Sequence, residues 1–246
     1  CYGRFYIFFA HIGFFSYLCR KLIQSPMKVI NLSEQPSLLN QYLKEMRSVE
    51  IQKDSMRFRR NIERIGEIMA VEISKHLSYA IEPVQTPLAI AEVQVPQDQI
   101  VLGTILRAGL PLHQGFLNMY DHAENAFVSA YRKEAEDEHG NVQLEIVSEY
   151  LAAPSLEGKT LILVDPMLAT GMSMEIAYKA LLTHGTPSHL HLVCAFATPK
   201  AIEHLQATIP ADATLWCAVI DPMLNEKKYI VPGLGDAGDL CFGGKL

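Results

Sequence analysis

The first clear pattern along the chain is a helical stripe of apolar side chains between residues 58 and 77. These side chains recur at spacings of three and four: Phe58, Ile62, Ile65, Met69, Ile73 and Leu77. That spacing puts them on one face of an α-helix, while charged residues such as Arg59 and Glu63 point elsewhere. The stripe predicts a helix that packs on the core.

From Ile100 onward the period changes. Five short apolar runs are predicted to be buried strands: Ile100–Leu106, Ala126–Tyr131, Leu161–Asp165, Leu190–Ala197 and Leu215–Ile220. Helix-length segments lie between most of them: Leu110–Tyr120, Met172–Thr183 and Lys200–Gln206. This alternation indicates an α/β fold with a mainly parallel sheet flanked by helices. Ligands bind such sheets at the carboxyl ends of strands, so the residues after each strand are the first candidates for a site.

Two stretches depart from this alternation. Tyr131–Glu149 holds a cluster of acids, then His139-Gly140-Asn141, then an alternating run, which predicts a projecting hairpin arm. The last 14 residues contain five of the 15 glycines and are predicted to form an irregular loop.

Composition narrows the class of protein. A chain of 246 residues that is 49% hydrophobic and 20% charged can bury one sizeable core, which excludes intrinsic disorder. The 21 basic residues against 27 acidic ones give a net charge of −6, so we expect no nucleic-acid partner. Five cysteines without CxxC spacing disfavour a disulfide scaffold and a zinc ribbon, and favour a reducing, cytoplasmic setting.

Residues 1–26 do not match the rest of the chain. They carry eight of its 21 aromatic side chains and no acid. Their apolar stretch, Phe5–Leu18, is shorter than the roughly 20 residues that span a bilayer, and no small-residue cleavage site follows it. We interpret residues 1–26 as a non-native or mis-started leader, with an export signal as the alternative, and residues 27–246 as a single domain without a membrane partner.

Three apparent motifs fail on context. Gly233–Gly238 fits the dinucleotide pattern G-x-G-x-x-G, but too little chain follows for the helix and second strand which that mechanism needs. Gly158-Lys159-Thr160 ends like a Walker A motif, yet it leads into a strand. His189 and His191 alternate along a strand without a third ligand nearby, so we expect exposed histidines there and no metal site.

The informative segment is Leu161–Ser173. A buried strand ends in Asp165, a short loop with Thr170, Gly171 and Ser173 follows, and a helix begins at about Met172. Such a loop aims backbone N–H groups at the positive end of a helix dipole, which suits a phosphate. Asp165 is placed to accept hydrogen bonds from sugar hydroxyls beside that phosphate. The segment predicts a phosphosugar site; a helix N-cap that binds nothing is the alternative.

This segment also resembles a known family. Val164–Gly171 is similar to the 5-phosphoribosyl-1-diphosphate (PRPP) loop of type I phosphoribosyltransferases, in the uracil phosphoribosyltransferase variant with Pro166 in place of a second acid. Three further segments resemble that branch in family order: Ile105–Gly109 its pyrophosphate loop, Tyr131-Arg132 the start of its flexible arm, and Tyr229–Asp239 its uracil loop. The resemblance runs from about Met27 to the C-terminus and implies the type I phosphoribosyltransferase fold.

The resemblance implies a set of site residues. The catalytic residues would be Arg107, Asp165 and Asp236. PRPP would be bound by Arg107, Arg132, Asp165, Pro166, Met167, Leu168, Ala169, Thr170, Gly171, Met172, Ser173 and Asp236. Uracil would be bound by the backbone at Ile230, Gly235, Asp236 and Ala237. Two departures from the family pattern are Met172, where many members have glycine, and His113, which we expect to face solvent.

The implied reaction joins uracil to PRPP and releases pyrophosphate and uridine 5′-monophosphate in pyrimidine salvage. It would use Mg²⁺ held mainly by PRPP, with no dedicated protein metal site, and run in a homo-oligomer, either a dimer or a tetramer. Transfer to another base and a non-catalytic nucleotide sensor on the same fold are the rival readings. Activation by a nucleotide such as GTP and the identity of a general base stay open.

Overall fold

The computed structural model describes residues 26–136 and 142–244, so the interpretation of residues 1–26 as a leader lies outside the described residues except at Pro26. Within them the centre of the fold is an eight-stranded sheet with the order β1-β10-β9-β7-β4-β5-β6, and β8 adds to β9. Every pairing is parallel except that of β5 with β6. The strands are β1 (Lys28–Asn31), β4 (Ile100–Leu106), β5 (Glu124–Glu136), β6 (Val142–Ala152), β7 (Thr160–Val164), β8 (Met167–Leu168), β9 (His189–Ala197) and β10 (Thr214–Ile220). The predicted α/β fold is confirmed, and Ile100–Leu106 is matched residue for residue.

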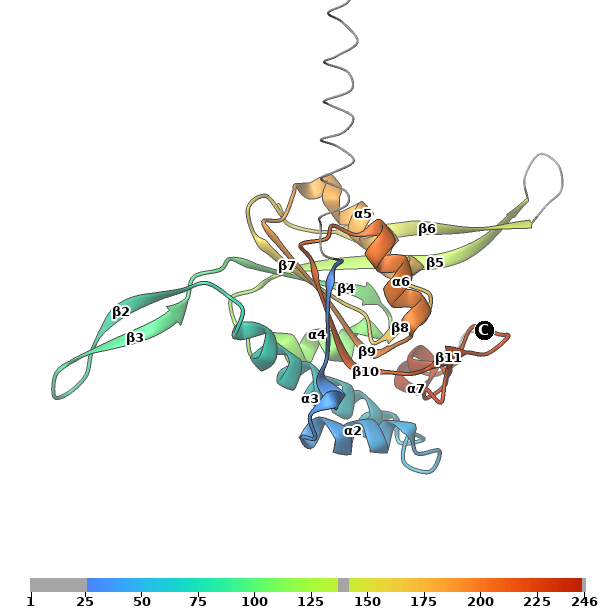
Figure 1. The fold of residues 1–246 in the computed structure, drawn as a ribbon, viewed down its shortest axis with the longest axis horizontal. Coiled ribbons are helices and arrows are strands. Elements are labelled where there is room, and N and C mark those ends of the chain that lie inside the picture. Colours follow the sequence, from blue (N-terminus) through green and yellow to red (C-terminus); the bar gives the residue numbers. More distant parts are fainter. Residues whose placement is uncertain (1–25, 137–141, 245–246) are drawn as a thin grey trace, which may run out of the picture.

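Helices cover both faces of this sheet (Figure 1). One face carries α2 (Leu38–Arg47), α3 (Ser55–Ser74) and α4 (Gly109–Leu117), and the other carries α5 (Met172–Leu181) and α6 (Pro199–Thr208). The predicted stripe from Phe58 to Ile73 is buried on α3, whereas Leu77 lies past the end of that helix. No helix in the described ranges is both long enough and apolar enough to cross a membrane.

Side chains at the helix starts explain where these helices begin. Ser37 and Asn40 form a reciprocal capping box at α2, and Asp54 accepts a hydrogen bond from the Arg57 N–H at α3. Pro199 occupies the first turn of α6, where its missing N–H leaves no bond unmade.

Two hairpin arms leave the sheet on opposite sides of the molecule (Figure 1). The arm of β5 and β6 confirms the prediction for Tyr131–Glu149, although residues 137–141 lie outside the described ranges. The second arm, β2 (Tyr79–Gln85) paired with β3 (Ile90–Pro96), is not predicted by the hydrophobic pattern. Its apolar side chains are exposed, among them Ile81 at 61%, Leu88 at 96% and Ile90 at 67%.

Candidate active site

A cleft of about 580 Å³ opens at the carboxyl ends of β4 and β7. Three separate segments line it: the turn after β4, which contributes Arg107; the loop after β7, which contributes Asp165; and a C-terminal segment that contributes Gly235. Parallel strands bring the first two segments together at one edge of the sheet, as expected for a ligand site in this fold class.

The loop after β7, residues 165–173, is called the phosphate loop below. A cavity of about 50 Å³ lies within it and shares Asp165, Met167, Ala169 and Ser173 with the cleft. Gly171 has φ +82° and precedes α5, and no described side chain caps that helix. A Cβ at Gly171 would lie 3.0 Å from the carbonyl oxygen of Ala201, so the position requires glycine. An uncapped helix N-terminus facing a small cavity suits a phosphate group.

Asp165 stands directly after β7, where the carboxyl is partly removed from water. The Met167 N–H donates a hydrogen bond to its Oδ1 at 3.2 Å. Burial raises the pKa of Asp165 to about 7, and the hydrogen bond from Met167 opposes that rise. The carboxyl therefore changes between its neutral and charged forms near neutral pH, and a ligand that donates hydrogen bonds to it favours the charged form.

Arg107 follows β4 across a cis Leu106–Arg107 peptide, and its side chain is 40% exposed. Its Nη2 lies 3.5 Å from Asp239 Oδ1 and donates to the Gly243 carbonyl oxygen at 3.3 Å. An exposed ion pair of this kind contributes at most about 1 kcal/mol, so the guanidinium can exchange these partners for an anionic ligand at little cost.

The third wall is formed by residues 228–237, called the C-terminal loop below. It contains β12 (Ile230–Val231), which pairs with β11 (Met223–Leu224), and it ends at α7 (Ala237–Phe242), so the prediction of an irregular loop for the last 14 residues is wrong at this helix. Gly233 has φ +50° and Gly235 has φ +97°. Asp236 caps α7 by accepting a hydrogen bond from the Asp239 N–H at 3.0 Å. The loop thus presents backbone to the cleft at Gly235, where a side chain is absent.

The structure brings most of the predicted site residues together. The cleft or the phosphate-loop cavity is lined by Arg107, Asp165, Met167, Leu168, Ala169, Thr170, Gly171, Ser173, Ile230, Gly235, Asp236 and Ala237. Pro166 and Met172 line neither one; Pro166 is buried and its carbonyl oxygen accepts from the Phe196 N–H at 2.9 Å. Arg132 belongs to β5, and the prediction for its side chain lies outside what the structure describes.

Two expectations for histidines are wrong. His113 is 3% exposed rather than solvent-facing, and its Nε2 lies 2.7 Å from Asn125 Oδ1. His191 is also buried, at 8%, because its Nδ1 accepts a hydrogen bond from Trp216 Nε1 at 3.2 Å. In both cases the hydrogen-bond partner of the imidazole is at least twelve residues away along the chain, so local sequence could not reveal it. His189 is exposed, as predicted.

Sequence reasoning missed two polar residues in the cleft, Ser129 and Lys228, whereas Tyr229, which also lines it, begins the predicted uracil loop. Ser129 pairs with Leu106 across β4 and β5, so the strand register is the signal that places it beside Arg107. Lys228 has φ +63° and directly precedes the motif that begins at Tyr229. Its position next to that motif could have indicated a cation at the rim.

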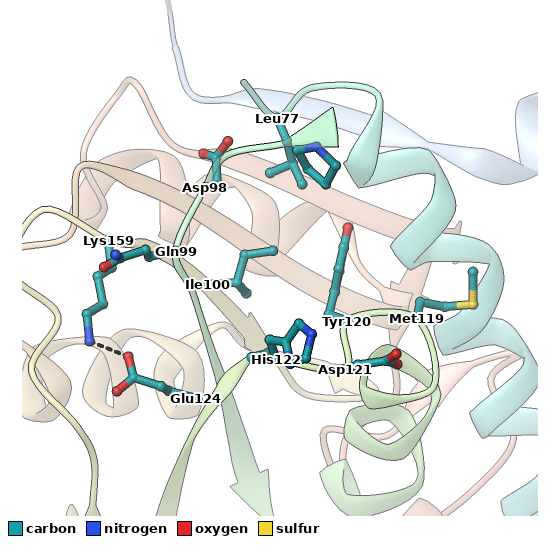
Figure 2. A pocket seen from close by; sticks show the side chains of 12 residues that line it. Leu77, Asp98, Gln99, Ile100, Met119, Tyr120, Asp121, His122, Glu124 and Lys159 are labelled. Atoms are coloured by element: carbon teal, nitrogen blue, oxygen red, sulfur yellow. Dashed lines mark hydrogen bonds and ion pairs between the residues drawn. The ribbon is translucent and has the colours of Figure 1, made fainter. Parts of the chain in front are cut away.

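A second pocket, of about 610 Å³, lies at the opposite, amino-terminal ends of the same strands (Figure 2). Ile100 and Tyr120 lie in it, and its rim includes the Lys159–Glu124 ion pair. None of the predicted site residues lines it, so we assign the function to the cleft at the carboxyl ends.

Within the described ranges, no three His, Cys, Asp or Glu side chains converge as a metal site. Two carboxylates, Asp165 and Asp236, do line the same cleft. Mg²⁺ typically binds through one or two carboxylates together with substrate phosphate oxygens, and this donor set fits that arrangement.

Comparisons with known proteins agree with the geometry. A family model described as "Uracil phosphoribosyltransferase" matches residues 33–244. A curated protein of that name from Porphyromonas gingivalis is 55% identical over 220 residues, which is 89% of this chain and all of that protein. Another of the same name from Pyrobaculum arsenaticum is 38% identical over 190 residues, 76% of this chain and 88% of its own length.

A solved structure of a protein from Aquifex aeolicus has a similar fold. It superposes with a TM-score of 0.74 at 27% identity and covers 87% of this chain and 98% of its own. The matched segment contains the phosphate loop, the Arg107 turn and the C-terminal loop that together form the cleft. The chain therefore belongs to the uracil phosphoribosyltransferase family.

Proposed function

We propose that this chain transfers the phosphoribosyl group of PRPP to N1 of uracil, giving uridine 5′-monophosphate and pyrophosphate. The observation that carries the proposal is that three loops, each suited to one part of the two substrates, meet in one cleft. The N1–C1′ bond forms, the bond between C1′ and the pyrophosphate oxygen breaks, and the N1 proton leaves to solvent or to pyrophosphate.

The phosphate loop is assigned to the ribose 5-phosphate. Its small cavity lies at the N-terminus of α5, where the helix dipole and first-turn N–H groups favour an anion. Asp165 beside it would accept hydrogen bonds from the ribose hydroxyls and so orient C1′ toward the base. These contacts hold the sugar while positive charge develops on its ring, much as in glycoside cleavage.

Arg107 is assigned to the departing pyrophosphate. Its guanidinium would leave the weak contacts with Asp239 and Gly243 and bind the diphosphate oxygens, a bidentate geometry to which arginine is suited. Arg132 from the β5–β6 arm remains the second proposed cation. Both would stabilise the negative charge that forms as the C1′–O bond breaks.

The C-terminal loop is assigned to uracil. The base has two carbonyl acceptors and an N3–H donor, and the backbone at Ile230, Gly235 and Ala237 offers both donors and acceptors. At Gly235 a Cβ would meet nothing within 4 Å, so the space beside this backbone is open to a flat ring.

Mg²⁺ is the proposed cofactor. Asp165 and Asp236 would hold it in part, with most of its ligands coming from PRPP. When bound, it would neutralise part of the pyrophosphate charge and make that group a better leaving group.

We also propose that the chain, as a single domain over residues 27–246, forms a homo-oligomer, a dimer or tetramer, in the cytoplasm. The exposed apolar side chains of the β2–β3 arm support this part of the proposal, since such side chains on a projecting element are typical of an interface. Measurement of mass by sedimentation, with Ile81→Lys and Ile90→Lys as interface variants, tests it.

The test of the function is a coupled assay of pyrophosphate release that depends on both PRPP and uracil. We expect turnover with uracil and none with cytosine or hypoxanthine. Preference for a purine would contradict the base assignment. PRPP binding without turnover of any base would support the rival reading, a nucleotide sensor.

A further inference from the structure

An ion pair between a partly exposed arginine and a buried aspartate lies beside the C-terminal loop, outside the cleft. Arg47, the last residue of α2, donates from Nη1 and Nη2 to the two carboxylate oxygens of Asp221 at 3.0 and 2.7 Å. The Asp221 side chain is 4% exposed and that of Arg47 26%. Such a fork-to-fork pair fixes direction as well as distance, because two parallel hydrogen bonds must be kept at once.

Both partners also bind the backbone of one glycine in the loop. The Gly233 N–H donates to Asp221 Oδ2 at 3.0 Å, and Arg47 Nη1 donates to the Gly233 carbonyl oxygen at 3.0 Å. Gly233 is packed so closely that a Cβ would lie 2.1 Å from the Ile230 carbonyl oxygen. The ion pair therefore satisfies both backbone polar groups of Gly233 and fixes the path of the loop there.

The same pair is attached to the segment beside the phosphate loop. The Arg47 guanidinium lies 4.8 Å from the centre of the Phe196 ring, and the Asp221 N–H donates to the Ala197 carbonyl oxygen at 2.8 Å. Phe196 and Ala197 pair with β8, which belongs to the phosphate loop. The cluster thus lies between the two loops that would hold the two substrates.

We propose that Arg47 and Asp221 are positioning residues that set the C-terminal loop for uracil recognition. This inference rests on the proposed function. Neither residue lines the cleft, but Gly235, Asp236 and Ala237 follow Gly233 by two to four residues. A loop freed at Gly233 spends only a fraction of its time in the recognising conformation, and the apparent KM for uracil rises by the inverse of that fraction.

The first test is Arg47→Lys. Lysine keeps the charge, but one ammonium group cannot reproduce the paired bonds to Asp221 and the third bond to Gly233. We expect the KM for uracil to rise at least about tenfold, which is about 1.4 kcal/mol. The kcat at saturating uracil should stay within about threefold, and the KM for PRPP should rise much less than that for uracil, because the phosphate loop keeps its own support from β7 and β9 and only Asp236 of the C-terminal loop is assigned to PRPP.

A second variant excludes the possibility that an unpaired buried charge, rather than the loss of loop support, causes the effect. Arg47→Met combined with Asp221→Leu removes both charges and leaves no unpaired buried ion, so what it removes is the support of the Gly233 N–H and carbonyl oxygen. We expect the same rise in the KM for uracil, together with faster hydrogen exchange of the Gly233 amide while β9 amides stay protected.

The matched control is Arg57→Lys. Arg57 on α3 pairs with Glu45 of α2 at 3.2 Å, so it also ties α2 down but touches neither loop. The KM of this variant for uracil should stay within about twofold of the wild-type value, even if its Tm is lower.

Three results would overturn the inference: an unchanged uracil KM in Arg47→Lys, a parallel rise in the KM values for uracil and PRPP, or an equal effect in Arg57→Lys. A wild-type protein that does not use uracil would instead contradict the proposed function. In that case the hydrogen-exchange rate of the Gly233 amide would still show whether Arg47 and Asp221 hold the C-terminal loop in place. A failure of the proposed function can therefore be distinguished from a failure of the positioning role.

Discussion

Asp165→Asn should make the protein more stable at alkaline pH and at the same time much less active. Burial raises the pKa of this carboxyl from 3.8 to about 7. The folded protein therefore holds the proton more tightly than the unfolded chain does. The stability linked to that proton is complete below pH 3.8 and is lost progressively as the pH rises to about 7.

The size of the effect follows from the shift. About three pKa units at about 1.4 kcal/mol each give at most about 4 kcal/mol of folding free energy lost on ionisation. Asparagine never ionises, and its amide oxygen can still accept the hydrogen bond from Met167. If half of the limit survives relaxation and hydration, the variant gains about 2 kcal/mol at pH 8, or roughly 4–8 °C in Tm for a chain of this size.

Thermal unfolding of both proteins between pH 4 and 9 measures this difference. The two curves should meet near pH 4 and separate up to pH 7, where the difference becomes constant. In parallel, kcat/KM for PRPP should fall at least about tenfold, since the charged carboxylate that orients the ribose is gone. Asp121→Asn, at an exposed position, is the control and should change neither quantity.

An equal or lower Tm for Asp165→Asn at pH 8 would refute the desolvation argument. Unchanged activity would remove Asp165 from the site. The wild-type kcat/KM for PRPP should also rise between pH 6 and 8, with a step near pH 7 that is absent in the variant. The reason is that both oxygens of Asp165 can accept hydrogen bonds from ribose hydroxyl groups only when the carboxyl is ionised.

Three other substitutions probe separate parts of the molecule. Arg107→Ala should raise the KM for PRPP at least about tenfold and lower stability by no more than about 1 kcal/mol, because its exposed pair with Asp239 is weak. PRPP titration and thermal melts measure the two effects, and an unchanged affinity for PRPP would contradict the role of Arg107. Gly235→Val places a β-branched residue at φ +97°, which costs about 1–3 kcal/mol of backbone strain, and adds a side chain to the space proposed for uracil. Turnover of uracil should collapse while PRPP still binds, and normal use of uracil would disprove recognition by the backbone. Burial and the nearby His189 and His76 lower the pKa of His191 to about 4, so the contribution of His191 to stability should fall by about 3 kcal/mol as pH drops from 6.5 to 4, while that of Asp165 rises over the same range. His191→Gln, which keeps an acceptor for Trp216, should therefore gain stability relative to wild type as pH falls from 6.5 to 4 in acid melts, and a constant difference between the two proteins would rule out this role of His191.

The sheet and the phosphate loop could be predicted from sequence because burial leaves a periodic trace. Ile100–Leu106 is apolar except at Thr104, since both faces of β4 are covered by helices, and the run that ends at Asp165 is apolar for the same reason. The loop then follows from local chemistry: an acid at a strand end, a glycine in the left-handed region, and a helix start. None of these depends on a distant contact.

The β2–β3 arm could not be predicted in the same way. Every residue of β2 is exposed, and Pro83 lies in the middle of it, so no face of the strand is fixed by the core of this chain. The histidine errors have a related cause. Burial of His113 and His191 is decided by Asn125 and Trp216, and a local pattern of residues contains no information about such partners.

The two halves of the cleft are therefore supported in different ways. The phosphate loop continues directly from β7 and adds β8 to the sheet, so it moves only if the core moves. The C-terminal loop is held by the two-residue strands β11 and β12, by the buried side chains of Ile230 and Leu234, and by the Arg47–Asp221 pair, whose members are 174 residues apart, and it adds no strand to the central sheet. Regions with few buried contacts open at lower free energy than the core. Mild destabilisation, by temperature or denaturant, should therefore weaken uracil recognition before PRPP binding, and the uracil KM should rise well below the unfolding midpoint.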